Sequence, residues 1–265
     1  MTNFALAIVG GGNMGAALVG GLLRAGSLPE HLAVVEVSAP RRDVLTAMFP
    51  AVAVLDELPR CDGAVIAVKP NDAVAAAGLA AAAGAQRILS IAAGISVAAL
   101  QFAAGDRVAV IRSIPNTPAL VGQGAAAICG GPAIDEADLQ WAEEILGAVG
   151  TVVRVSEKQL DAVTGLVGSG PAYVFLIAEA LIEAGVLVGL ARPTAEALVR
   201  QLLVGSAALL DDRGDPATLR AMVTSPGGTT AAGLRVMEQH GVRSAMLEAV
   251  VAATKRSVEL GLSVH

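Results

Sequence analysis

The chain has 265 residues, of which 54% are hydrophobic, 16% are charged and only 2% are aromatic. This aliphatic content can offset the entropy cost of ordering a large core, which excludes a disordered chain. The length allows one large domain or two modest ones. A net charge of −6 and the scarcity of aromatic residues exclude a protein that stacks nucleic-acid bases.

A mean hydropathy of +0.65 raises the question of a membrane span, which needs about 20 nearly uninterrupted apolar residues. The two most apolar runs are 4–23, which glycines and Asn13 interrupt, and 172–190, which carries two glutamates. The first 23 residues contain no Lys or Arg and do not read as a signal peptide. Cys61 and Cys129 lack metal-ligand spacing. We therefore expect a cytoplasmic protein with no metal site and no membrane or nucleic-acid partner.

Short apolar runs alternate with helical segments through the first half of the chain. Strands are predicted at 5–9, 33–37, 64–68, 88–91, 108–111, 125–129 and 151–155. Helices are predicted at 14–25, 41–48, 73–83, 97–103 and 136–146. Buried strands that alternate with helices predict right-handed crossovers and a mostly parallel α/β sheet.

The second half shows helical spacing only. Helices are predicted at 170–188, 193–211, 215–223, 228–239 and 242–261, with Gly and Pro between them. We therefore predict an α/β domain over 1–157 and an all-helical domain over 158–265. Broad apolar faces, such as that of Val174, Leu181 and Val186, favour burial against a second subunit. The alternative is an alanine-rich composition that makes every helix look apolar.

A glycine-rich turn joins the first strand to the first helix. Gly10, Gly12 and Gly15 form the pattern G-x-G-x-x-G, which allows a tight turn, close approach of a pyrophosphate and close helix–strand packing. The amides at the helix start, at Asn13 and Met14, then face an anion. This pattern predicts a Rossmann-type dinucleotide-binding domain.

The cofactor's ribose has two candidate partners. Glu36 lies about 20 residues beyond the turn, where a carboxylate accepts the ribose hydroxyls of NAD. Arg41 and Arg42 follow closely and could instead pair with the 2′-phosphate of NADP, or simply lie in solvent. The sequence leaves the choice between NADH and NADPH open.

Two more strand ends point to the same crevice, because ligands of open α/β sheets bind at the carboxyl ends of the strands. The first brings a lysine and a proline to the site, and the second brings small residues that suit a nicotinamide ring. The predicted cofactor-binding residues here are Ala67, Val68, Lys69, Pro70, Ala92, Ala93 and Gly94.

Four segments carry a more specific signal: 112–118 (RSIPNTP), 161–166 (DAVTGL), 168–173 (GSGPAY) and 223–230 (VTSPGGTT). In this order and spacing the chain resembles the pyrroline-5-carboxylate reductases over essentially its whole length. The resemblance implies reduction of 1-pyrroline-5-carboxylate to L-proline with NADPH or NADH. It also implies a Rossmann domain, a helical C-terminal domain that interlocks with its partner into a dimer, and often further assembly into a decamer.

The segment 223–230 is a Gly-rich loop that opens a helix, and a helix N-terminus suits a small carboxylate. The resemblance implies that this loop holds the substrate carboxylate through Val223, Ser225, Gly228, Thr229 and Thr230. It further implies that the Thr230 hydroxyl meets the ring nitrogen, as the catalytic group. Asn116, in the first motif, is predicted to bind the cofactor.

The predicted mechanism needs little acid catalysis, because an imine nitrogen can be protonated before hydride arrives. The three histidines lie outside every motif, and no carboxylate pair is placed for acid–base work. A β-hydroxyacid dehydrogenase, the nearest rival, would need a lysine on the long helix 170–188, which has none. A cofactor-binding sensor would not need the loop at 225–230.

Overall fold

The computed structural model describes residues 3–132 and 134–262. Their contacts divide the chain into two compact units. The first unit runs to Ser169 and also includes the residues from Val251 onward, and the second unit is Gly170–Val250. The predicted boundary between 157 and 158 remains a prediction, since it marks a change of character rather than a break in contacts.

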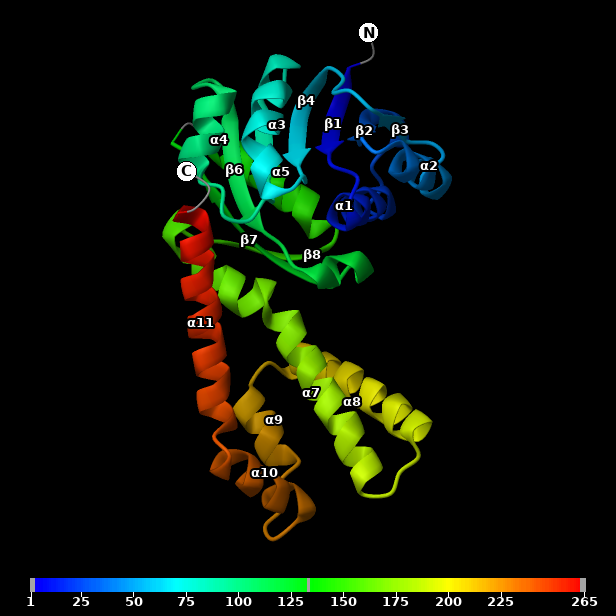
Figure 1. Cartoon of the computed structure of the whole chain (residues 1–265), viewed down its shortest axis with the longest axis vertical. Coiled ribbons are helices and arrows are strands. Elements are labelled where there is room, and N and C mark those ends of the chain that lie inside the picture. Colours follow the sequence, from blue (N-terminus) through cyan, green and yellow to red (C-terminus); the bar gives the residue numbers. More distant parts are fainter. Residues whose placement is uncertain (1–2, 133, 263–265) are drawn as a thin grey trace. The chain divides into compact units, whose positions relative to one another are not determined.

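The first unit is built on one eight-stranded sheet (Figure 1). Its order is β3-β2-β1-β4-β5-β6-β7-β8, and every pairing is parallel except that between β6 and β7. The strands are β1 (Phe4–Val9), β2 (Leu32–Val35), β3 (Ala53–Leu55), β4 (Cys61–Ile66), β5 (Arg87–Ser90), β6 (Ala109–Ile114), β7 (Gly124–Gly130) and β8 (Gly150–Arg154).

Helices pack on both faces of this sheet. They are α1 (Asn13–Arg24), α2 (Ala39–Met48), α3 (Pro70–Ala82), α4 (Val97–Ala104) and α5 (Glu136–Gly147). Side chains alternate along each strand, so that in β1 Ala7 joins the core beneath α3 and α4, while Ile8 joins the core beneath α1, α2 and α5. Strands buried on both faces read as continuous apolar runs, which is the pattern in the sequence.

Small residues explain how so aliphatic a chain packs closely. In α3 the buried positions are Ala73, Ala76, Ala77 and Ala80, which form one stripe at helical spacing. Alanine has no bulk beyond Cβ and loses no side-chain entropy, so the helix lies close to the sheet without large side chains. The scarcity of aromatic residues therefore does not leave this core underfilled.

Chain order reverses between β1 and β4. From β1 the chain proceeds outward through β2 and β3, then returns to β4 on the other side of β1. In open α/β sheets, the crevice outside the strand ends at such a reversal is where ligands bind. The fold thus places a ligand crevice at the carboxyl ends of β1 and β4.

The second unit is helical, as predicted. It comprises α7 (Gly170–Leu187), α8 (Arg192–Arg213), α9 (Pro216–Met222), α10 (Thr229–Gln239) and the first half of α11 (Val242–Leu262). Ala195 and Val199, both in α8, are the buried residues among those described for this unit. Apolar side chains along α7 are exposed instead, among them Phe175, Leu176 and Leu187.

Between the sheet and α7 the chain forms α6 (Leu160–Val163) and a π-helical turn at Thr164–Gly168. Within the described residues, the helical stretch Glu157–Leu187 is the one that satisfies a membrane-span criterion of length and composition. The last turns of α11 belong to the first unit, where Ser257 donates a hydrogen bond of 2.7 Å to Asp161.

Candidate functional site: a dinucleotide pocket in the first unit

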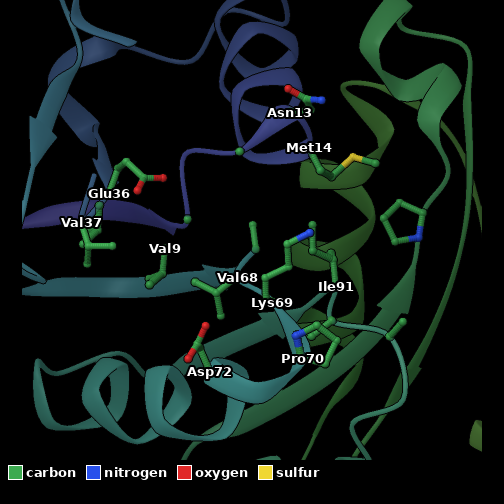
Figure 2. Close-up of a pocket in the computed structure, with 17 residues that line it drawn as sticks. Val9, Asn13, Met14, Glu36, Val37, Val68, Lys69, Pro70, Asp72 and Ile91 are labelled. Atoms are coloured by element: carbon green, nitrogen blue, oxygen red, sulfur yellow. The ribbon is translucent and has the colours of Figure 1, made fainter. Parts of the chain in front are cut away.

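A cavity of about 620 Å³ opens at the carboxyl ends of the central strands (Figure 2). It lies at the β1/β4 reversal, where the topology places a ligand crevice. The residues that line it are Val9, Gly10, Gly12, Asn13, Met14, Val35, Glu36, Val37, Ala67, Val68, Lys69, Pro70, Asp72, Ile91, Ala92, Ala93 and Pro115. Eleven of the predicted cofactor-binding residues are among them.

The glycine-rich turn forms one wall of the cavity, and each glycine of the pattern has a different role. Gly10 has φ +107°, and a Cβ there would lie 2.6 Å from the carbonyl oxygen of Ala67. A Cβ on Gly15 would collide with the carbonyl oxygen of Gly10. A Cβ on Gly12 would meet nothing within 4 Å, so the space over the start of α1 is open. This turn fits a pyrophosphate, which would meet the first amides of α1.

Glu36 forms another part of the wall, just beyond the end of β2. Its two carboxylate oxygens accept hydrogen bonds from two backbone amides, that of Gly11 at 3.0 Å and that of Ser38 at 2.9 Å. The two flanking arginines bind backbone carbonyls. Arg41 donates to Gly11 at 2.6 Å, and Arg42 donates to Glu36 and Val37, both at 2.9 Å.

Four predicted cofactor-binding residues do not line this cavity. Gly15 supports it from behind through close packing, and Arg41 is held against the backbone of the turn. Gly94 lies beside a second cavity instead. Asn116 is buried and its side chain makes two hydrogen bonds within the protein, and its role as a cofactor ligand stays a prediction.

The motif at 112–118 mainly stabilises the fold. The Asn116 carboxamide accepts from the amide of Ala125 at 2.9 Å and donates to the carbonyl of Val167 at 3.2 Å. Arg112 is buried and pairs with Glu157 at 3.2 Å, and Glu157 also accepts from the amide of Val97 at 2.7 Å. These contacts join the end of β6 to the start of β7, to the π-helical turn and to the N-terminus of α4. Only Pro115 of this motif reaches the cofactor cavity.

A second cavity of about 510 Å³ lies in the same unit. It shares Pro70 and Ala93 with the first cavity, so the two adjoin at the end where Ala92 and Ala93 lie. Its lining is partly polar. The residues are Pro70, Asn71, Ala93, Gly94, Thr164, Ser169, Ala253, Arg256, Ser257 and Leu260.

The predicted substrate loop lies in the second unit. Thr229 begins α10, and Gly228 is its N-cap. The amide of Gly228 donates to the carbonyl of Ser225 at 3.1 Å, so it already has a partner. The first amides of a helix have no partner within the helix, which leaves the amides of Thr229 and Thr230 as the donors of this loop. Val223, Ser225 and Thr229 are exposed, and Thr230 is half-buried.

Several lining residues escaped the sequence analysis. Val37 and Asp72 lie one and two residues beyond predicted positions, Glu36 and Pro70, and the strand-end rule applied more broadly would have found them. Pro115 lay in a quoted motif, but only the sheet order shows that the end of β6 reaches the cavity. Among the described residues, no group of three or more His, Cys, Asp or Glu could hold a metal ion.

Two sequence models of protein families match the chain. The pyrroline-5-carboxylate reductase dimerisation family matches residues 157–260, and a family described as NADP oxidoreductase coenzyme F420-dependent matches residues 5–94. Together they cover the helical region and the strands β1 to β5, which include the glycine-rich turn.

Relatives that match over nearly the full length carry the same family name. A pyrroline-5-carboxylate reductase of Synechocystis is 43% identical over 263 residues, and that of Corynebacterium melassecola is 40% identical over 265 residues. Each match covers 97% of this chain and 98% of the relative.

Solved structures agree with the sequence comparisons. A pyrroline-5-carboxylate reductase of Coxiella burnetii, 33% identical, matches with a TM-score of 0.91 over 97% of this chain and 98% of that one. The Plasmodium falciparum pyrroline carboxylate reductase, solved with NADP bound, is 31% identical and has a TM-score of 0.84 over 98% and 99% of the two chains. This chain belongs to the pyrroline-5-carboxylate reductase family.

Proposed function

We infer that this chain reduces 1-pyrroline-5-carboxylate to L-proline by hydride transfer from NADPH or NADH to the imine carbon, the last step of proline biosynthesis. The observation that carries this function is a dinucleotide pocket at the β1/β4 reversal in a chain that matches reductases of this name over 97% of its length.

The cofactor supplies the hydride, and the residues that line the pocket would hold the cofactor in place for the transfer. Gly10, Gly12, Asn13 and Met14 would hold the pyrophosphate at the start of α1, because free amides and the helix dipole both attract an anion. Ala92 and Ala93 would lie against the nicotinamide ring, since small side chains let a flat ring approach the backbone. These assignments rest on the lining of the cavity and on the family resemblance.

The substrate carboxylate would bind at the start of α10. The amides of Thr229 and Thr230 and the hydroxyl of Ser225 are its proposed donors, beside Val223. The Gly228 amide, predicted as a further donor, would instead hold the loop closed on Ser225. Gly227 has φ +70°, which favours glycine and lets the loop turn sharply into the helix.

The residues would then act mainly by orientation. Hydride transfer requires the donor and acceptor carbons within about 3.5 Å, and positioning of this kind lowers the barrier without acid–base groups. The Thr230 hydroxyl would donate to, or orient, the ring nitrogen. No histidine is among the residues proposed here to bind cofactor or substrate.

The test is oxidation of each nicotinamide cofactor with 1-pyrroline-5-carboxylate, followed by its absorbance. We expect turnover by the wild-type chain. Thr230→Ala should lower kcat/KM about 10- to 100-fold, the loss of one hydrogen bond worth ~1.4–2.7 kcal/mol. Thr218→Ala is the matched control, because Thr218 lies in α9, outside the proposed loop. Unchanged kinetics in Thr230→Ala would remove Thr230 from the mechanism, and no turnover by the wild-type chain would refute the function.

Self-association follows from the same resemblance. The dimerisation match over 157–260 and the exposed apolar side chains of α7 support a dimer whose helical domains interlock. We extend the proposal to further assembly as a decamer and to a cytoplasmic location, as the family resemblance implies.

A further inference from the structure

The ribose end of the cofactor pocket is built around one carboxylate. Glu36 lies where the ribose of a dinucleotide is expected in a Rossmann domain, just beyond the end of β2. Two amides hold its two oxygens, and the turn packs closely against the side chain, since a Cβ on Gly11 would lie 3.2 Å from the Cβ of Glu36. The carboxylate is therefore fixed in position and cannot swing away from a ligand without breaking both hydrogen bonds.

The remaining hydrogen-bonding capacity of Glu36 suits donors. An ionised carboxylate offers about four lone-pair positions and no hydrogen. The amides of Gly11 and Ser38 use two of them, which leaves two for the hydroxyl hydrogens of a ribose. A 2′-phosphate has only acceptor oxygens and carries negative charge, so at the same position it would meet a fixed like charge.

The neighbouring cations are bound in part to other groups of the protein. Arg41 donates from Nε to the carbonyl of Gly11. Arg42 donates from one terminal nitrogen to two backbone carbonyls, and its other terminal nitrogen lies 3.7 Å from a carboxylate oxygen of Asp56. Neither arginine is among the described residues that line the cavity. Lys69 does line it, but Figure 2 shows Lys69 beside Ile91 and Pro70, across the pocket from Glu36 and Val37.

We propose that Glu36 makes this pocket select NAD(H) over NADP(H). The proposal rests on the proposed function for its premise that a dinucleotide binds here, and it decides the choice that the sequence left open. It concerns this chain's own residues, and it predicts a preference that differs from the ligand seen in the Plasmodium falciparum relative, which was solved with NADP bound.

The test is binding without substrate, so that it does not depend on turnover. Dissociation constants for NADH and NADPH are measured by calorimetry, together with those for 5′-AMP and adenosine 2′,5′-bisphosphate. We expect wild-type protein to bind NADH at least about tenfold more tightly than NADPH, a difference of ~1.4 kcal/mol. The two adenine nucleotides should show the same order, because they differ at the 2′-phosphate.

Variants then identify the residue responsible. Glu36→Ser should reduce the ratio of the two dissociation constants at least about tenfold, and Glu36→Gln should shift it in the same direction while preserving side-chain size. Glu30→Gln removes one negative charge from an exposed position outside the pocket and should leave the ratio unchanged. Arg41→Ala should leave NADH the preferred cofactor.

The outcomes separate the preference from the function. Equal affinities, or tighter NADPH binding, would overturn the preference while leaving the reductase function intact. Unchanged ratios in both Glu36 variants, with wild-type Tm, would overturn the role of Glu36. Tighter NADH binding supports the proposal whether or not 1-pyrroline-5-carboxylate is turned over, and the absence of any cofactor binding would refute both proposals.

Discussion

The two units of this chain solve the problem of burial in different ways. In the first unit, two apolar clusters fill the space on the two faces of the sheet, and side chains such as Ile8, Leu18 and Leu89 are fully buried. In the second unit, Ala195 and Val199 are the buried residues among those described, although its helices are rich in Leu and Val.

This difference shows that a helical region can be well formed and still lack a core of its own. Large exposed apolar faces are typical of surfaces that another chain covers, and the dimerisation match over 157–260 includes these helices. The first unit is therefore expected to obtain its stability from its own core, and the second from association with another subunit. Each of the following measurements tests one side of that contrast.

The largest effect is expected in the core of the first unit. Leu18→Ala removes a side chain that is 0% exposed and should lower the free energy of unfolding by about 2–5 kcal/mol, because the lost burial and the remaining cavity both destabilise. Urea unfolding measures it. Leu79→Ala, at a position 64% exposed in the same unit, is the control and should change stability by less than about 0.5 kcal/mol. Equal effects would mean that the contrast in burial does not govern stability.

A charge on the exposed apolar face of α7 should act on association. Leu176→Glu, at a position 65% exposed, should weaken self-association by about 2–4 kcal/mol, as expected when a buried interface residue is lost. Sedimentation velocity over a concentration series measures the change. Phe102→Glu is the matched control, because Phe102 is 92% exposed in α4 of the first unit. If Phe102→Glu dissociates the protein and Leu176→Glu does not, the interface lies on the first unit, which would contradict this prediction.

A smaller effect is expected at Asn116, a predicted cofactor residue whose side chain makes two hydrogen bonds within the protein. Asn116→Ala leaves the amide of Ala125 without its partner and should lower the free energy of unfolding by about 1–3 kcal/mol. Calorimetric titration with NADH should give a dissociation constant close to that of the wild type. A large loss of cofactor affinity with unchanged stability would restore the sequence-based assignment.

The smallest effect concerns pH, and it reports on the first unit alone, since both cysteines lie there. Burial raises the pKa of Cys61 and of Cys129 from about 9 to about 11, with the nearby charges of Asp62 and Glu157 adding to the rise. Between pH 9 and pH 11 the unfolded chain releases these protons while the folded chain keeps them, so stability should fall as pH rises.

Urea unfolding across that range, compared between wild type and the double variant Cys61→Ala, Cys129→Ala, isolates the thiols from lysine and tyrosine titration. The wild type should lose more stability than the double variant above pH 9. Parallel curves would show that these thiols ionise as readily in the folded chain as in the unfolded one.

The sequence predicted most of the fold because hydrophobic periodicity marks each element and Gly or Pro residues mark where it ends. All five helices of the second half lie within a few residues of their predicted positions, since Gly and Pro mark their ends. The pattern did not reveal β3, whose three residues are only half-buried, or the antiparallel pairing of β6 with β7. Strand direction within a sheet depends on partners distant in sequence, and periodicity carries no information about them.

In the candidate site too, features set by neighbouring residues were predictable and features set by distant partners were not. The glycine-rich turn was readable because Gly10, Gly12 and Gly15 are required by local backbone geometry and close packing. The structural contacts of Asn116 could not be read in this way, because a polar residue in a motif can equally bind a ligand or satisfy a buried amide. Its two hydrogen bonds join segments 9 and 51 residues away in the chain.

By itself, the sequence determined the α/β-then-helical order, the dinucleotide turn and the resemblance to a reductase family, because each is encoded in neighbouring residues. Only the tertiary structure decided which side chains beyond the end of β2 line the cavity. Glu36 and Arg41 are equally plausible partners in the sequence, but folding brings both to the glycine-rich turn. There two backbone amides hold the carboxylate in the cavity wall, while Arg41 donates to the carbonyl of Gly11 and does not line the cavity.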